Sequence, residues 1–160
     1  MDVGADLTTL NTMPVVPGVL AEEEFELELL RYEMHPAHRV PTYQFHMVDR
    51  ETREVLGNIR LSTESTPHIE LYAGHIGYGV LPKHRGHHYA ARAVKLLVPL
   101  ARKLGIDPLW ITCDPENSAS RRTLELAGAE LIEVVDVPEN CVIRRKGHPQ
   151  KCRYRLSTTD

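Results

Sequence analysis

The stretch that decides the fold is LYAGHIGYGVLPKHRGHHYAARA, residues 71–93. Its first part, residues 71–81, predicts an apolar strand that holds three glycines, and glycines inside strands mark bulges or the close approach of a backbone or a ligand. Its last part opens an alanine-rich segment with apolar residues at helical spacing. We therefore expect a helix over about residues 88–104, with Pro99 kinking its last turns. A strand, a tight turn and a helix follow one another here.

The turn between this strand and this helix is suited to an anion. The first turn of a helix leaves backbone N–H groups without partners and carries a partial positive charge. Lys83, Arg85 and Arg92 add cationic side chains around it, so a phosphate-bearing ligand fits best. The alternatives are a metal, a nucleic acid and a purely structural turn. Against them, the neighbours His87 and His88 point to different sides of a helix, and the aromatic content of 6% is low for nucleic-acid stacking.

The remaining elements predict a mixed α/β fold. Strands are expected at residues 42–48, 54–62, 108–113, 130–137 and 151–157. Residues 20–34 fit a helix or a strand, because helix formers alternate there with period two. A helix capped by Asp114 or Asn117 follows the strand that ends at residue 113, and a loop is expected over residues 138–149. This order predicts a β-α-β crossover with antiparallel flanks.

Length and composition bound the class of protein. The 160 residues suit a single domain over residues 1–160, with residues 1–18 irregular. A net charge of −3 argues against a dedicated nucleic-acid binder. The three cysteines, at positions 113, 141 and 152, form no CxxC pair, which favours a reduced chain over a zinc site or disulfide scaffold. The polar start predicts no signal peptide, and no run is long enough to span a membrane. We expect a cytoplasmic protein with no metal, membrane or nucleic-acid partner.

Two motifs in this order resemble those of the GNAT superfamily of N-acetyltransferases. The first is V-x-P-x-x-R-G-x-x-Y-A, with Arg85 and Ala90 at the outer places of the family's [QR]-x-x-G-x-[GA] and His88 at its middle glycine. The second is N-x-x-[AS]-x₇-G, which Asn117, Ser120 and Gly128 match. The resemblance covers about residues 40–137. It implies a mostly antiparallel mixed sheet, flanked by helices and splayed at the glycine-rich strand.

The resemblance also implies acetyl-CoA as co-substrate. Backbone N–H groups of the turn would hold its pyrophosphate, the pantetheine arm would run along the glycine-rich strand, and an asparagine would contact the arm from the far side. Carried over to this sequence, the implied cofactor-binding residues are Gly79, Val80, Arg85, Gly86, His87, His88, Tyr89, Ala90 and Asn117.

The reaction implied by the resemblance is direct attack of a primary amine on the thioester in a ternary complex. A backbone N–H near Val80 would stabilise the oxyanion. Gly74 stands where relatives carry a glutamate base, so the adjacent His75 is the candidate base, with Glu70 or a water relay as alternatives. Leu124 stands where relatives carry a tyrosine acid, and Tyr78 is the candidate in its place. These departures keep a non-catalytic acyl-CoA-binding regulatory domain open as the alternative function.

We expect the acceptor to be a small-molecule or peptide amine. Two charged segments give opposite indications of its chemistry. The acid-free basic run at residues 144–155 suggests an acceptor bearing a carboxylate or phosphate. The acidic segment at residues 22–28 suggests a polyamine or a basic peptide. The sequence leaves the oligomeric state open, a homodimer included.

Overall fold

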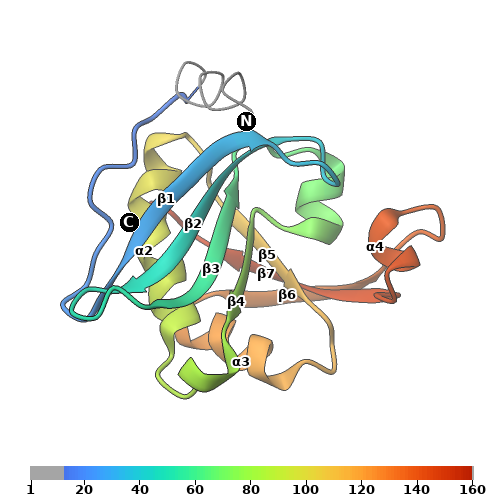
Figure 1. Cartoon of the computed structure of the whole chain (residues 1–160). Helices are drawn as coiled ribbons and strands as arrows, with labels where there is room; N and C mark the ends of the chain where they lie inside the picture. The colour runs from blue at the N-terminus through green and yellow to red at the C-terminus, as the bar shows by residue number, and fades with distance from the viewer. Residues whose placement is uncertain (1–12, 160) are drawn as a thin grey trace.

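The computed structural model describes residues 13–159, and its strands form two antiparallel sheets. The first sheet has the order β1-β2-β3-β4, with bounds Phe25–Met34, Pro41–Asp49, Val55–Ser62 and Ile76–Val80. The second has the order β5-β7-β6, with bounds Leu109–Cys113, Gln150–Leu156 and Glu130–Asp136. Figure 1 shows the second sheet beside and behind the end of the first. The expected mixed α/β fold with mostly antiparallel sheets flanked by helices is confirmed.

Two longer helices cover the sheets. Helix α2, Tyr89–Lys103, lies behind the first sheet, and helix α3, Ser118–Leu126, lies below the end of β4 (Figure 1). The alanines of α2 and its leucines Leu97 and Leu100 are buried because they recur on one helical face. The helix runs through Pro99 to its end. Shorter helices are the 3₁₀ turn Pro82–His84 and α4, Val142–Arg145, which lies inside the loop expected at residues 138–149.

Residues 20–34, where the sequence fits either a helix or a strand, form β1 from Phe25 onward. Antiparallel pairing with β2 over its whole length, with a bulge between Leu29 and Arg31, decides for the strand. Phe25 and Leu27 then face the core, where both are buried. Pairing with the next strand along the chain therefore outweighs the local helix propensity of this segment.

The strand expected at residues 71–81 is half wrong, because β4 starts only at Ile76. The preceding segment Ile69–Ala73 is a π-helical turn, closed by a 2.7 Å bond from the Gly74 N–H to the Ile69 carbonyl. Gly74 has a φ of 74°, a conformation that glycine adopts without strain and that ends the turn. A side chain on Gly74 would also lie 3.0 Å from the Thr112 backbone nitrogen.

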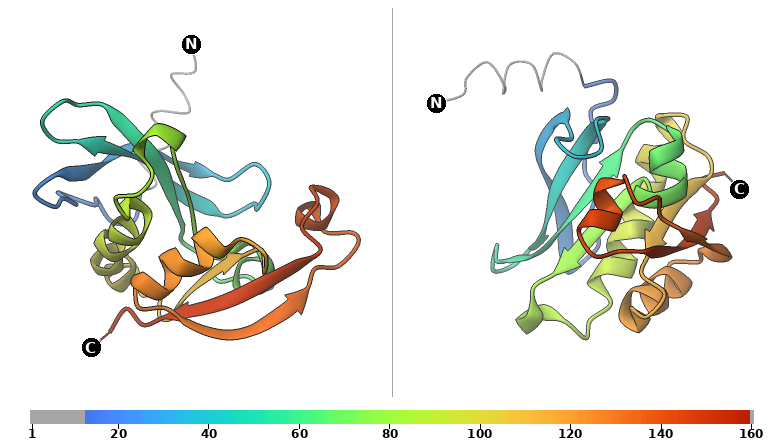
Figure 2. Two further views of the ribbon diagram at one scale, coloured as in Figure 1. Left: turned by 90° about the horizontal axis from the view of Figure 1, so that it is seen from below. Right: turned by 90° about the vertical axis from the view of Figure 1, so that its right-hand side faces the viewer.

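The two sheets touch at the start of β4 and separate beyond it. The His75 N–H donates to the Trp110 carbonyl at 2.6 Å, and no ladder between β4 and β5 continues from there within residues 13–159. Figure 2 shows the two sheets as separate layers that diverge, with α3 lying against the second sheet. The splay expected at the glycine-rich strand is thus present, and it opens the edge of β4 that β3 does not cover.

None of the helices described within residues 13–159 is long and apolar enough to cross a membrane.

Candidate functional site

The turn before α2 holds backbone N–H groups without hydrogen-bond partners among the described residues. Gly86 has a φ of 96° and His88 a φ of 60°, so both adopt the left-handed region. Within the described part of the chain, the N–H groups of Gly86, His87 and His88 have no hydrogen-bond partner. They lie next to the first turn of α2, whose own N–H groups are unpaired by the geometry of a helix. This turn, called the anion nest below, thus has the kind of unpaired backbone donors with which a nest holds an anion.

His88, at the start of the helix expected over residues 88–104, lies just before α2 and is not helical. His88 is the N-cap of α2 in the left-handed conformation, with ψ of 27°. That region costs an L residue roughly 1–2 kcal/mol, and glycine enters it freely. The histidine at this position therefore keeps the backbone of the motif's glycine at the cost of local strain.

A first cavity of about 480 Å³ opens between the end of β4, this turn and α3. Eight residues that the resemblance assigns to the cofactor line it: Gly79, Val80, Arg85, Gly86, His88, Tyr89, Ala90 and Asn117. His87 does not line the cavity; its ring packs against Tyr89, with centroids 5.3 Å apart, and its carbonyl accepts from Arg92. Arg122 of α3 also lines this cavity. It was not predicted from the sequence, because an exposed arginine on a helix carries no signal that it lines a binding cavity.

His75 lies in the core and reaches neither cavity. It is fully buried, and burial lowers its pKa to about 4. Its Nδ1 accepts a 2.9 Å bond from the Trp110 N–H, so the ring proton sits on Nε2, which lies 2.8 Å from Ser65 Oγ. Both ring nitrogens are occupied, and this geometry fits a residue that joins β4 to β5 rather than a base. Glu70 lines neither cavity either.

Tyr78 stands where the first cavity meets a second one. Its hydroxyl lies 2.7 Å from Ser120 Oγ, and burial raises the pKa of the phenol to about 12. The neighbouring thiol of Cys113 is buried too, which raises its pKa to about 11 and leaves it unreactive. Tyr78 is therefore a protonated donor held by Ser120, at the place where both cavities share Tyr78, Asn117 and Ser120.

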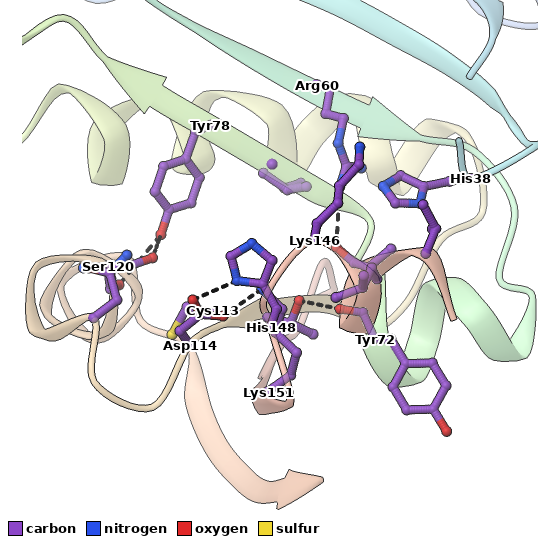
Figure 3. A pocket seen from close by; sticks show the side chains of 17 residues that line it. His38, Arg60, Tyr72, Tyr78, Cys113, Asp114, Ser120, Lys146, His148 and Lys151 are labelled. Atoms are coloured by element: carbon purple, nitrogen blue, oxygen red, sulfur yellow. Dashed lines mark hydrogen bonds and ion pairs between the residues drawn. The ribbon is translucent and has the colours of Figure 1, made fainter. Parts of the chain in front are cut away.

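The second cavity, of about 310 Å³, lies between the two sheets and the segment around α4. Figure 3 shows Tyr78 and Ser120 on one side of it and Arg60, Lys146 and His38 on the other, with His148 between them. Its polar and titratable lining comes from strands, helices and the loop before β7: His38, Arg60, Tyr72, Tyr78, Thr112, Cys113, Asp114, Asn117, Ser120, Lys146, His148 and Lys151.

A carboxylate and a histidine form a pair in this second cavity. His148 Nδ1 lies 2.7 Å from Asp114 Oδ2, and Lys151 Nζ lies 3.0 Å from Asp114 Oδ1. Burial disfavours the charged form of Asp114, but its bonds to Lys151 and His148 outweigh burial, so its pKa lies below the usual value. The ionised carboxylate accepts the Nδ1 proton, an arrangement that fixes the ring orientation of His148 and directs any proton exchange to Nε2.

The sequence does not single out this pair. His148 falls in a segment expected to be a loop, and Asp114 is one of two expected helix caps. The structure gives the cap to Asn117, whose Oδ1 accepts from the Ser120 N–H at 3.0 Å. Asp114 is thereby free to hold His148, 34 positions further along the chain.

The two charged segments occupy different places. Of the basic run at residues 144–155, only Lys146, His148 and Lys151 line the second cavity, while Arg153 and Arg155 pair with glutamates of β6. The acidic segment at residues 22–28 lines neither cavity, and four of its glutamates form ion pairs. Their partners are Arg92, Arg50 and Arg53. This segment therefore gives no support to a basic acceptor.

No group of three or more His, Cys, Asp or Glu side chains among the described residues is placed to hold a metal ion.

Comparisons with known proteins agree on one family. The model of the acetyltransferase (GNAT) domain matches residues 5–130. An acetyltransferase of the GNAT family from Bacillus anthracis has a TM-score of 0.58 at 18% identity, covering 73% of this chain and 67% of that one. A provisionally assigned ribosomal-protein-serine acetyltransferase from Vibrio cholerae has a TM-score of 0.63 at 17% identity, covering 89% and 99%.

A third solved structure shows a relative with its ligands. The spermidine N-acetyltransferase from Vibrio cholerae, in complex with CoA and spermine, has a TM-score of 0.55 at 14% identity, covering 73% of this chain and 66% of that one. At these identities the solved structures support the fold alone. None of the curated proteins compared matches the sequence.

Proposed function

Because the chain belongs to the GNAT family of acetyltransferases, we propose that it moves an acetyl group from acetyl-CoA to a primary amine by direct attack in a ternary complex. The observation that carries this proposal is the meeting of two cavities at Tyr78, Asn117 and Ser120. One cavity leads to the anion nest before α2, and the other leads to the pair of Asp114 and His148. Each substrate has its own entrance, and the reacting atoms meet between them.

The first cavity fits acetyl-CoA by the groups that line it. The unpartnered N–H groups of residues 86–88 would take the diphosphate, with Arg85 and Arg122 as cationic side chains beside it. The uncovered edge of β4 would receive the pantetheine arm as an added strand along Gly79 and Val80. A backbone N–H near Val80 would stabilise the negative charge that develops on the thioester oxygen.

His148 is the base that this geometry supports. An acceptor amine enters as an ammonium ion, and Nε2 of His148 takes one of its protons. Asp114 holds Nδ1–H and stabilises the imidazolium that results, as the carboxylate of a catalytic triad does. The neutral amine then forms the C–N bond to the thioester carbon.

Tyr78 is the acid. As the C–S bond breaks, the phenol of Tyr78 gives its proton to the sulfur and recovers one through Ser120 or solvent. A pKa of about 12 keeps the phenol protonated until the thiolate forms. In balance, the ammonium loses two protons: His148 passes the first to solvent, and the second leaves the nitrogen of the tetrahedral intermediate as the C–S bond breaks. That second proton replaces, through Ser120 or solvent, the one that Tyr78 gives to the sulfur.

Ligand binding and turnover test this proposal separately. Acetyl-CoA at a hundredfold over its dissociation constant adds about 2.7 kcal/mol of stability, and the melting temperature should rise by roughly 5–10 °C. Free thiol should then appear with members of a panel of small amines, amino acids and peptides. Failure of acetyl-CoA to raise the melting temperature at millimolar concentration would overturn the proposal. A rise without thiol release on the panel would favour a non-catalytic acyl-CoA-binding domain.

A further inference from the structure

We propose that the second cavity binds its acceptor through an anionic group, a carboxylate or a phosphate, carried on the same molecule as the amine and held by Arg60 and Lys146. This inference rests on the proposed function and names the class of acceptor. It is carried by one juxtaposition: a guanidinium and an ammonium group without carboxylate partners line the end of the cavity opposite Tyr78.

Arg60 reaches the cavity from β3 with neutral partners only. Its Nη1 lies 3.1 Å from Ser62 Oγ and 3.4 Å from the Gly74 and His75 carbonyls, and its Nη2 donates to the Ala73 carbonyl at 3.2 Å. No carboxylate of the described residues forms an ion pair with it. Burial lowers the pKa of Arg60 to about 10, which still leaves it charged at neutral pH.

The contacts of Arg60 with backbone carbonyls also hold the end of the helical turn Ile69–Ala73. These contacts do not use all of the N–H donors of the guanidinium. A guanidinium has five N–H donors, and Nε–H has no partner among the described residues. The cross-strand partner Gly77 makes room for this nitrogen, because a side chain there would come within 2.8 Å of Arg60 Nε. A buried charge without an opposite charge is costly, and an acceptor anion would supply that charge.

Lys146 adds a second cation at the same end of the cavity (Figure 3). It follows α4, is exposed, and forms no ion pair with any residue in the range 13–159. Lys151, in contrast, already has Asp114 as its partner. The cavity lining thus holds three cationic side chains, Arg60, Lys146 and Lys151, against the single carboxylate of Asp114.

His38, a titratable side chain that also lines the cavity, does not change this excess of positive charge. His38 lies beside Arg60, and burial together with the Arg60 charge lowers its pKa to about 3, so it is uncharged at neutral pH. An acceptor with several amines and no acid, such as a polyamine, would meet net positive charge here. An acceptor with an acidic group would meet a complementary field.

The geometry places the two ends of such a molecule. Its amine must lie near Tyr78 and His148, while its anion lies toward Arg60 and Lys146 across the cavity (Figure 3). A cavity of about 310 Å³ is at the small end of the range for ligand sites. It suits a small amino acid, a phosphorylated amine or the acidic end of a peptide.

The test uses acceptor pairs that differ in the anion alone. β-Alanine against β-alaninamide probes a carboxylate, and phosphoethanolamine against ethanolamine probes a phosphate. With the full chain and saturating acetyl-CoA, thiol release should give a kcat/KM at least tenfold higher for the anionic member of one pair. The pair with the larger ratio identifies the acid. Calorimetric titration of the same compounds onto the CoA complex measures binding without turnover.

Lys146→Glu should reduce the anionic preference tenfold or more in both measurements. Arg145→Glu is the matched control, because Arg145 is exposed one position away, lines neither cavity, and undergoes the same change of charge. Equal values within both pairs, or equal effects of the two variants, would overturn the inference. Anion-dependent binding without thiol release would uphold the anion site and overturn the transferase proposal. Thiol release with equal rates for the anionic and neutral members of both pairs would uphold the transferase proposal and overturn the anion site.

Discussion

At His148, Asp114 holds one ring nitrogen, and the residue lines the second cavity, where we propose that the acceptor binds. General bases contribute typically 10²–10⁴-fold to a rate. We therefore expect His148→Gln to lower kcat by about that factor, with the Kd of acetyl-CoA within twofold of the original value. Steady-state thiol release and calorimetric titration of acetyl-CoA measure the two quantities.

The control for this variant is His46→Gln, a histidine of β2 that lines neither cavity and should leave both quantities unchanged. Asp114→Asn should also lower kcat, because a neutral amide does not stabilise the imidazolium. Full activity in His148→Gln would show that another group, or solvent, takes the amine proton.

At His88, the backbone adopts a conformation suited to glycine. Its φ of 60° predicts that His88→Gly relieves strain, and we expect the free energy of unfolding to rise by about 0.5–1 kcal/mol after the entropy of glycine in the unfolded chain is subtracted. Urea denaturation measures this change. His88→Ala keeps the penalised φ and should bring no gain, so equal stability of the two variants would show that the turn relaxes instead.

At the scale of elements, α3 faces the anion nest across the first cavity. Arg122 is its cationic contribution, exposed and without an ion-pair partner among the described residues. A charge-assisted bond to a phosphate contributes about 1.5–3 kcal/mol, so Arg122→Ala should weaken acetyl-CoA binding by roughly 10- to 100-fold. Lys103→Ala, an exposed cation at the end of α2, is the matched control. An equal small loss in both variants would show that only the overall charge matters.

The elements were predictable where the signal is local. Residues 88–104 show apolar residues at helical spacing and the residues that typically start and end a helix, and α2 lies there. The start of β4 was not predictable, because residues 71–75 are apolar enough for a strand and only the positive φ of Gly74 and its packing on β5 turn them into a helical segment. The ambiguity at residues 20–34 had the same origin, since pairing with β2 decides it.

The two cavities of the site also differ in how far the sequence could predict them, because one is built from neighbouring residues and the other from distant ones. The first cavity draws on one contiguous stretch and on the length of α3, and eight of its lining residues follow from motifs in the sequence. The second cavity brings together Arg60, Asp114 and His148 from distant parts of the chain. No spacing rule connects these positions, so the sequence indicated a basic segment that could border an acceptor entrance but singled out neither His148 nor Arg60.

At the scale of the whole molecule, buried histidines make stability depend on pH. His75 has a pKa of about 4 in the folded chain and an ordinary value of 6.5 when unfolded. Between these values the unfolded state binds the extra proton, so stability is present above pH 6.5 and is lost as the pH falls toward 4. A shift of this size corresponds to roughly 3 kcal/mol for this residue. Denaturation at pH 7, 5.5 and 4 measures it.

His75→Gln should flatten this dependence, because Gln retains a hydrogen-bonding group but does not titrate. Since the variant removes the link between β4 and β5, its stability at pH 7 should fall. His38→Gln, at the edge of the cavity, should flatten the slope by a separate increment. A wild-type chain equally stable at pH 7 and 4 would contradict the buried neutral state of both rings.

The splay between the sheets has a consequence for how such a chain diversifies. The residues proposed to hold acetyl-CoA lie on β4, the turn and α3, whereas those proposed to select the amine lie on β3 and on the segment between β6 and β7. Substitutions in that segment can therefore change which amine is accepted while the proposed acetyl-CoA site stays the same.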